Sequence, residues 1–323
     1  MFDTGGRVIR MNAAREWDDR QVAEHPMPWG PRDRAALVAL MRLRPKNAHW
    51  SDLTERVLLS RGARALWDSE HHQGLFGSTP EDVILEQAER DVESWRSAPF
   101  EFYTFMDDGY PEQLRSVRQM PPVVFTQGKR VNGDVGICVV GSRKVSDVGK
   151  RFAQTVARAL VAESVSVVAG LAEGVDTAAH WAALDAGGRT VAVLGNGLDR
   201  VYPRSNAALQ KEIAARGMLL THFLPEYGPT RWSFPARNVT MSAYSVATVV
   251  VEAGEHSGTR IQAREAVAHG RPVILNSTVV QATSWARELR DEPGVYVAAS
   301  PDEVIAHVRT ILAHRDKVSM WLN

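Results

Sequence analysis

The residues best suited to chemistry stand in short loops that follow apolar segments, and the first such loop lies within 139-VVGSRKVSDVG-149. Gly141 permits a sharp turn, Ser142 and Ser146 offer hydroxyls, and Arg143 offers a guanidinium that can bind phosphate through two hydrogen bonds. A helical pattern begins near Ser146, and the free N–H groups of a helix start stabilise an anion. The spacing matches neither the dinucleotide fingerprint nor the Walker A motif. The loop therefore predicts a phosphate site of another kind, with a tight turn that carries an exposed basic pair as the alternative.

A second loop, within 169-AGLAEGVDTAAH-180, combines glycines with an acid and an imidazole. Gly170 and Gly174 would let the backbone approach a ligand closely. Asp176 and His180 are four residues apart and share one face of a helix. In one interpretation the carboxylate and the imidazole form an acid–base couple. In the other, which we favour, Asp176 caps its own helix and His180 is a packed structural residue.

A third loop, 195-GNGLDRVYPRSN-206, follows another apolar segment. The turn around Asn196 and Gly197 suits a hydrogen bond to a base or a sugar, but it suits a tight connection equally well. Both interpretations stay open at this point. We expect the helix that follows to be capped by Ser205 or Asn206.

The segment 252-EAGEHSGTRIQAREA-266 contains another helix start. Ser257, Gly258 and Thr259 form a second potential phosphate site there. Glu252 ends a buried strand and needs a partner, which we expect to be a ligand hydroxyl or backbone N–H groups around the pocket. Two anion-binding helix starts that face one crevice argue for a nucleotide more strongly than either does alone.

Aromatic and basic residues alternate in 225-PEYGPTRWSFPARN-238, the longest stretch that we expect to be irregular. It holds the rings of Trp232 and Phe234 beside Arg231 and Arg237. Single-stranded nucleic acids are bound by such sets, with bases stacked on rings and phosphates on guanidinium groups. Alternatively both rings close the edge of a sheet, and the segment by itself does not decide between the two.

Short apolar runs rich in β-branched residues must position these loops. The runs are 135-VGICVV-140, 165-VSVVAG-170, 190-TVAVLG-195, 246-VATVVVEA-253 and 272-PVILN-276. Continuous apolar strands that alternate with amphipathic helices indicate an α/β fold, with a Rossmann-like, doubly wound, mostly parallel sheet buried on both faces. Ligands of such sheets bind beyond the carboxyl ends of the strands, which is where the loops above stand.

The chain before residue 135 has a different pattern. Apolar residues recur at helical spacing in 33–43, 51–68 and 81–97. Aromatics, turn signals and a Pro-Pro pair follow, with a short strand expected at 123–126, while 285–312 near the other end is typical of a helix, a strand and a final helix. We expect four parts: a helical N-terminal domain at 1–100, a connector packed on the main domain at 101–134, the Rossmann-like domain at 135–315 and a tail at 316–323.

Composition excludes several classes of protein. Lys plus Arg equals Asp plus Glu at 38 each, so any polyanion site must be a local patch. Cys138 is the only cysteine, which excludes an internal disulfide and a zinc cluster of thiolates. The histidines lack ligand spacing, so we expect no metal and no other cofactor. No run is apolar enough to span a membrane and no signal-peptide core is present, so we expect a cytoplasmic protein that does not contact a membrane.

Read in order, five segments resemble the bacterial DNA-processing protein A (DprA) family, also called Smf, which shares a superfamily with the LOG-type phosphoribohydrolases. The segments are 140-VGSRKVSDVG-149, 170-GLAEGVDTAAH-180, 192-AVLGNGLDRVYPRSNAAL-209, 234-FPARN-238 and 252-EAGEHSGT-259. The resemblance implies a homodimer that binds single-stranded DNA and hands it to RecA during DNA uptake and recombination. It also implies that no residue is catalytic.

The same resemblance implies a role for each matching residue. Those that would meet phosphate are Gly141, Ser142, Arg143, Ser146 and Gly149. Those that would shape the floor of the pocket are Gly170, Ala172, Gly174 and Asp176. Phe234, Arg237 and Asn238 would lie along the DNA strand, with Phe234 stacking on a base. The predicted site is completed by Asn196, Gly197, Glu252, Ser257, Gly258 and Thr259.

The sequence departs from the family pattern at several positions, and these departures weaken the DNA-uptake role more than the fold. Thr221-His222 stands where Ser-Glu is usual, Val239 replaces a basic residue, and 257-SGTRIQA-263 replaces S-G-[ST]-L-x-T-A. An alternative function is a small-nucleotide sensor or a nucleoside-phosphate hydrolase like the LOG-type relatives. Glu252 and His222 would then act as acid and base on a glycosidic bond.

Overall fold

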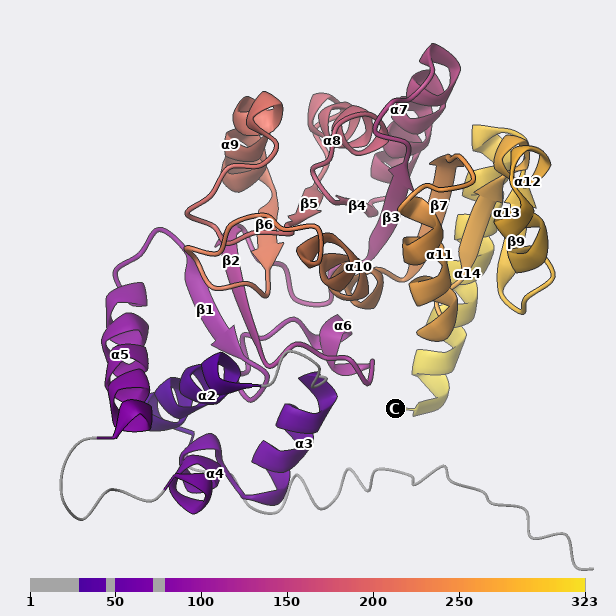
Figure 1. The fold of residues 1–323 in the computed structure, drawn as a ribbon. Helices are drawn as coiled ribbons and strands as arrows, with labels where there is room; N and C mark the ends of the chain where they lie inside the picture. Colours follow the sequence, from indigo (N-terminus) through magenta and orange to yellow (C-terminus); the bar gives the residue numbers. More distant parts are fainter. Residues whose placement is uncertain (1–28, 45–49, 72–78, 323) are drawn as a thin grey trace, which may run out of the picture.

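The computed structural model describes residues 29–44, 50–71 and 79–322, and its centre is a nine-stranded sheet in the order β1-β2-β6-β5-β4-β3-β7-β8-β9 (Figure 1). The strands are β1 (Glu101–Thr104), β2 (Val123–Gly128), β3 (Gly136–Gly141), β4 (Ser166–Ala169), β5 (Thr190–Val193), β6 (Met218–Thr221), β7 (Ala247–Glu252), β8 (Val273–Asn276) and β9 (Val295–Ala298). β2 pairs antiparallel with β1 and β6, and all other neighbours are parallel. The predicted mostly parallel α/β fold is confirmed.

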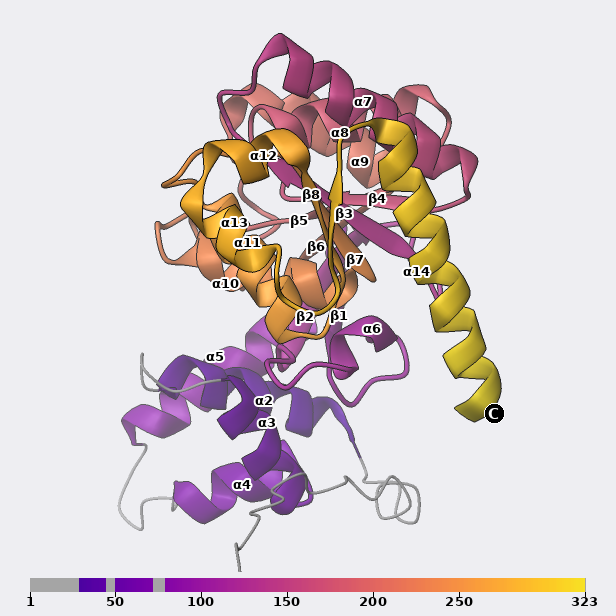
Figure 2. The ribbon, with the colours of Figure 1, turned by 90° about the vertical axis from the view of Figure 1, so that its right-hand side faces the viewer.

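Helices cover both faces of the central strands. Ile137 and Val139 of β3 belong to one buried cluster, formed with α7 (Asp147–Ala162), α8 (Val175–Asp185) and α14 (Pro301–Leu322). Cys138 and Val140 belong to the other, formed with α10 (Ser233–Tyr244), α11 (Thr259–Ala268) and α13 (Ser284–Leu289). Successive side chains of a strand point to opposite faces, so an unbroken apolar run is explained by these two layers. Figure 2 shows α14 and α11 on opposite sides of the strands.

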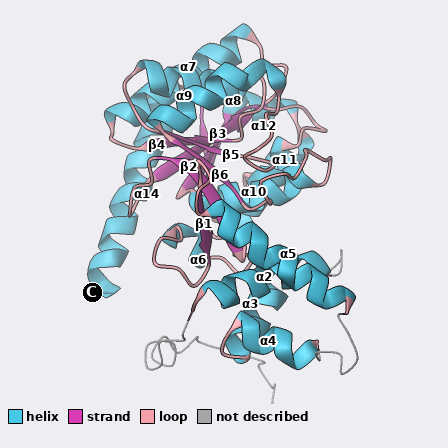
Figure 3. Cartoon of the chain, turned by 90° about the vertical axis from the view of Figure 1, so that its left-hand side faces the viewer, coloured by secondary structure: helices cyan, strands magenta, loops and turns pink. Residues whose placement is uncertain are grey.

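The helical N-terminal region packs beside the antiparallel strands (Figure 3). It contains α2 (Pro31–Leu43), α3 (Trp50–Leu59), α4 (Ala63–Glu70) and α5 (Pro80–Trp95). The Trp95 ring lies 5.0 Å from the ring of Phe102 in β1 and 4.9 Å from that of Phe125 in β2. These contacts join the helices and the sheet in one hydrophobic cluster.

The single helix expected at 51–68 is in fact two helices, and this prediction was wrong. Arg61 has a φ of 58°, in the left-handed region, and the Gly62 N–H donates to the Val57 carbonyl oxygen at 3.0 Å. This closing pattern ends α3 and starts α4 in a new direction. Gly62, a residue common at helix ends, was the sequence signal for the break.

The segment expected to be a connector contributes strands to the sheet. The short strand expected at 123–126 is β2, whereas β1 was not predicted. Near the other end, the expected helix, strand and helix are α13, β9 and α14. Because α14 runs to Leu322, the expected tail at 316–323 begins inside a helix. No helix within the described ranges is long and apolar enough to cross a membrane.

Candidate functional site

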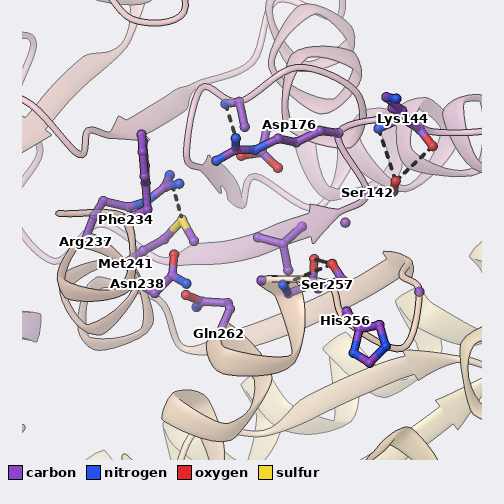
Figure 4. A pocket seen from close by; sticks show the side chains of 17 residues that line it. Ser142, Lys144, Asp176, Phe234, Arg237, Asn238, Met241, His256, Ser257 and Gln262 are labelled. Atoms are coloured by element: carbon purple, nitrogen blue, oxygen red, sulfur yellow. Dashed lines mark hydrogen bonds between the residues drawn. The ribbon is translucent and has the colours of Figure 1, made fainter. Parts of the chain in front are cut away.

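A cleft of about 580 Å³ lies at the carboxyl ends of β3 and β7, between the loops that follow these strands and helices α10 and α11 (Figure 4). Arg143 and Thr259, from the two predicted phosphate loops, both line it. The other predicted residues that line it are Gly141, Ser142, Ala172, Asp176, Phe234, Arg237, Asn238, Ser257 and Gly258. Loops far apart in the sequence meet here because the parallel strands end at one edge of the sheet.

The loop after β3 presents its basic residues to solvent. The Ser142 hydroxyl donates to the Lys144 carbonyl oxygen at 2.8 Å and accepts from the Lys144 N–H at 3.1 Å, which closes a compact turn. Arg143 and Lys144 are exposed and line the cleft. Within the described residues neither one forms an ion pair with an acidic side chain. Their charge is therefore open to an anionic ligand.

The floor of the cleft is built around the buried guanidinium of Arg237. Its Nη1 donates to the Val193 carbonyl oxygen at 3.0 Å, and a Cβ added at Gly170 would lie 1.2 Å from the same nitrogen. Gly174, with a φ of 81°, similarly leaves room for the carbonyl oxygen of Ser142, which a Cβ would approach to 2.2 Å. These glycines thus allow protein segments to approach one another, and Gly170 also lines a hollow of about 130 Å³ beside the cleft.

Asp176 balances the charge of Arg237 inside the protein. Its Oδ2 accepts from the N–H groups of Gly170 at 2.9 Å and Ala172 at 3.3 Å. Burial raises the pKa of Asp176 and the nearby Arg237 lowers it, while burial lowers the pKa of Arg237 and Asp176 raises it. Since these two charges offset each other, the positive charge that an anion meets in the cleft comes mainly from Arg143 and Lys144.

Asp176 and His180 do not form the acid–base couple. His180 is fully buried, and its Nδ1 lies 2.6 Å from the Thr190 hydroxyl, which itself donates to the Val167 carbonyl oxygen. Nδ1 is therefore the donor, and burial lowers the pKa of His180 to about 3. The favoured structural reading holds for His180. Asp176 does not cap its own helix, however, because α8 begins after Gly174 and the carboxylate holds the preceding loop instead.

Ser146, Gly149 and Glu252 line a different hollow, of about 330 Å³. Ser146 caps α7, as expected, by accepting from the Gly149 N–H at 3.0 Å. Glu252 accepts from the Ser146 N–H at 3.0 Å and from its hydroxyl at 2.5 Å. The expected backbone partner of Glu252 is thus present, but the structure does not bring these three residues to the cleft.

The loop after β5 borders a small hollow of about 130 Å³, which shares Arg143, Phe234 and Arg237 with the cleft. Asn196 lines it, but its side-chain amide donates to the carbonyl oxygens of Gly197 and Arg200, both at 2.9 Å. A Cβ on Gly197 would lie 2.0 Å from the Leu224 carbonyl oxygen. These residues make a tight connection, and Asn196 also borders the small hollow.

A family model described as DNA recombination-mediator protein A matches residues 101–308. The chain belongs to this family. The Smf protein of Synechocystis is 36% identical over 218 residues, which cover 65% of this chain and 54% of Smf. DprA of Streptococcus pneumoniae is 34% identical over 212 residues, covering 64% of this chain and 74% of that protein. The chain thus spans about half the length of the first of these relatives.

Solved structures of family members have the same fold. The X-ray structure of Streptococcus pneumoniae DprA superposes with a TM-score of 0.61 at 26% identity, covering 85% of this chain and 92% of that one. DprA of Helicobacter pylori, from a study of its single-stranded DNA binding mode, superposes with a TM-score of 0.58 at 23% identity. The match covers 65% of this chain and 97% of that one.

In this family member, the segment expected to be irregular at 225–238 ends in a helix. Phe234, Arg237 and Asn238 stand on α10, which begins at Ser233 and turns all three side chains into the cleft lining. Ser205 or Asn206 was expected to cap α9 (Ala207–Arg216). Asn206 stands at the cap position, but its side chain makes no cap and donates to the Leu171 carbonyl oxygen at 2.9 Å, while the Ser205 hydroxyl donates to Glu173 at 2.7 Å.

Sequence reasoning missed some lining residues, namely Met241, His256 and Gln262. Gln262 lies three residues after Thr259 on α11, and Met241 lies four after Arg237 on α10, so helical spacing was the available signal. Within the described ranges, no group of three or more His, Cys, Asp or Glu side chains could hold a metal ion.

The acid and base of the hydrolase alternative are not assembled. Glu252 binds Ser146 in the separate hollow, and His222 is buried with its Nδ1 2.7 Å from the Thr240 hydroxyl. Burial and the nearby Arg44 lower the pKa of His222 to about 3. Neither side chain lines the cleft, so this geometry offers no pair to attack a glycosidic bond there.

Proposed function

We propose that this chain binds single-stranded DNA in the cleft as a DNA-processing protein of the DprA type. The observation that carries the proposal is the meeting of Arg143, the ring of Phe234 and the start of α11 around one opening. A phosphate can bind the guanidinium and the helix start while a base stacks on the ring.

Charge supports a polyanion as the ligand. The whole chain has a formal net charge of zero, so attraction must be local. Arg143 and Lys144 supply that local charge, because Asp176 offsets Arg237. Phosphates along a strand would release counterions on binding here, so affinity should fall steeply with salt.

The shape of the site favours a strand over a single nucleotide. The cleft of about 580 Å³ adjoins a hollow of about 130 Å³ and another of about 500 Å³, and all three are lined by Arg143 and Phe234. A chain of nucleotides can pass these two residues and occupy more than one hollow, whereas a mononucleotide can fill only part of the space.

The test is fluorescence anisotropy of labelled oligo-dT over a range of salt concentrations, with a duplex of equal length and unlabelled mononucleotides as competitors. We expect binding of the single strand that weakens as salt rises, little binding of the duplex, and no competition by mononucleotides. Absence of oligo-dT binding by micromolar protein at low salt would contradict the proposal. Saturable binding of mononucleotides, or release of free base from them, would instead favour the small-nucleotide sensor or hydrolase.

Family membership supports a finer proposal, in which a cytoplasmic homodimer passes the bound strand to RecA during DNA uptake and recombination. Two linked sites on one strand would raise affinity without new contacts. Light scattering of the purified chain tests the dimer, and RecA assembly on protein-coated single strands tests the transfer. A monomer at all concentrations, or RecA assembly that the chain does not accelerate, would exclude the corresponding part.

A further inference from the structure

Trp232 is far more exposed than the other aromatic side chains near the cleft. Its side chain is 72% exposed, against 36% for Tyr202. Because burying a tryptophan contributes strongly to folding, an exposed ring beside a proposed binding site is a candidate for contact with the ligand.

The backbone holds Trp232 in a defined position. The Thr230 hydroxyl accepts from the Ser233 N–H at 3.1 Å, and the Ser233 hydroxyl accepts from the Thr230 N–H at 3.1 Å. This reciprocal pair closes a turn that holds Arg231 and Trp232 directly before α10, which begins at Ser233. The guanidinium carbon of Arg231 also lies 4.8 Å from the centre of the Trp232 ring. The closed turn and the contact with Arg231 thus hold the ring in a defined place.

An outer hollow of about 500 Å³ connects this region to the cleft. It is lined by Arg143, Tyr202, Pro229, Thr230, Arg231, Phe234, Pro235 and Gly258. Arg143, Phe234 and Gly258 line the cleft as well, so the two spaces are continuous. The Tyr202 ring lies 5.5 Å from that of Phe234. Arg231 lines the hollow and also contacts the Trp232 ring, so rings and guanidinium groups extend from the cleft to Trp232.

We propose that the outer hollow and Trp232 form a second stacking segment for the same DNA strand, which leaves the cleft across Phe234 and Tyr202. This inference rests on the proposed function. Base–aromatic stacking is tolerant of sequence, because every base has a π-face, and arginines beside the rings bind the intervening phosphates. The segment lengthens the site without adding base specificity, so its contribution depends on the length of the strand.

The test compares the affinities of oligo-dT of about 4 and about 12 nucleotides for the wild-type protein and for Trp232→Ala and Trp232→Phe. We expect Trp232→Ala to weaken the longer oligonucleotide by about 5-fold or more and to leave the shorter one unchanged. Trp232→Phe keeps a ring and should bind both within about 2-fold of wild type. Leu59→Ala, which alters another exposed apolar residue (78% exposed) on α3, is the matched control and should change neither.

Intrinsic fluorescence gives a second readout. The longer oligonucleotide should quench the wild-type tryptophan emission, and Trp232→Phe should lose most of that quenching while it retains affinity. If the wild type binds both oligonucleotides and Trp232→Ala binds each of them with the same affinity as the wild type, this inference is overturned and the proposed function stays intact. No binding by the wild type would contradict the proposed function itself. A change of oligomeric state in Trp232→Ala, without a length-dependent loss of DNA affinity, would show that the ring contacts protein and would also overturn the inference.

Discussion

The guanidinium carbon of Arg143 lies 5.2 Å from the centre of the Phe234 ring. Arg143 follows β3 and Phe234 stands on the first turn of α10, so residues 91 positions apart (234 minus 143) form one cation–ring pair. Both side chains line the cleft and both adjoining hollows. A nucleotide that reaches one of them must therefore meet the other.

Replacing Arg143 by alanine should weaken the binding of single-stranded DNA by about 1–3 kcal/mol, the value of a charge-assisted contact. The slope of log affinity against log salt should fall by about 0.7, because one phosphate contact is lost. Anisotropy at several salt concentrations measures both quantities. Arg158→Ala, which removes an exposed arginine on α7, is the control and should leave both unchanged. Equal loss in the two variants would place the phosphate contact elsewhere.

Replacing Phe234 by leucine should weaken DNA binding by about 1–3 kcal/mol, because leucine keeps apolar volume but has no face for stacking. Phe234→Tyr retains the ring and should bind like the wild type. Titration with oligo-dT measures the difference. If leucine binds as well as tyrosine does, the ring serves packing alone.

Replacing Gly170 by alanine should lower the free energy of unfolding by about 1–3 kcal/mol, because the new Cβ would lie 1.2 Å from Nη1 of Arg237 and must displace its guanidinium. DNA affinity should fall as well, since Arg237 lines the cleft. Urea denaturation gives the stability. Gly228→Ala, whose Cβ would meet nothing within 4 Å, should change it by less than about 0.5 kcal/mol. A Gly170→Ala protein as stable as Gly228→Ala would show that Arg237 moves without cost.

Acidification should destabilise the fold through two buried histidines. The pKa values of His180 and His222 are lowered to about 3 from 6.5, so their contribution to stability is complete above pH 6.5 and is lost as the pH falls towards 3. Between pH 7 and pH 5.5 each should remove about 1 kcal/mol from the free energy of unfolding.

Urea denaturation at the two pH values tests this. His222→Asn should lose about half of the pH dependence in this range. His256→Ala removes an exposed histidine and should retain all of it. The same pH dependence in all three proteins would mean that other groups titrate.

Much of the architecture could be predicted because long-range and local signals agreed. Runs such as 135-VGICVV-140 are apolar at every position. A strand needs apolar residues at successive positions only when both of its faces are buried. β1 was missed because 101-EFYT-104 is short and half-exposed, and becomes a strand only by pairing with β2. Its formation depends on tertiary contacts that no local pattern encodes.

The predicted site lies at the correct edge of the sheet, but some of the side chains predicted for it lie on the other face of their strand. Glu252 ends β7, where a register shift between Val140 and Gly141 changes the pairing with β3. Since side chains alternate between faces, a shift of one residue decides which hollow a side chain enters. Glycines posed a related problem, because Gly170 makes room for Arg237, a side chain that only the fold brings there.

The antiparallel pairing of β2 with β6 decides where the chain can be shortened. Starting a truncated protein at residue 135 would strip β2 from β6 and leave the hydrogen-bonding groups of 218-MLLT-221 as a bare edge. Such an edge recruits strands from other molecules and promotes aggregation. Expression of the sheet and its cleft without the preceding helices should therefore begin ahead of Glu101 and include both antiparallel strands.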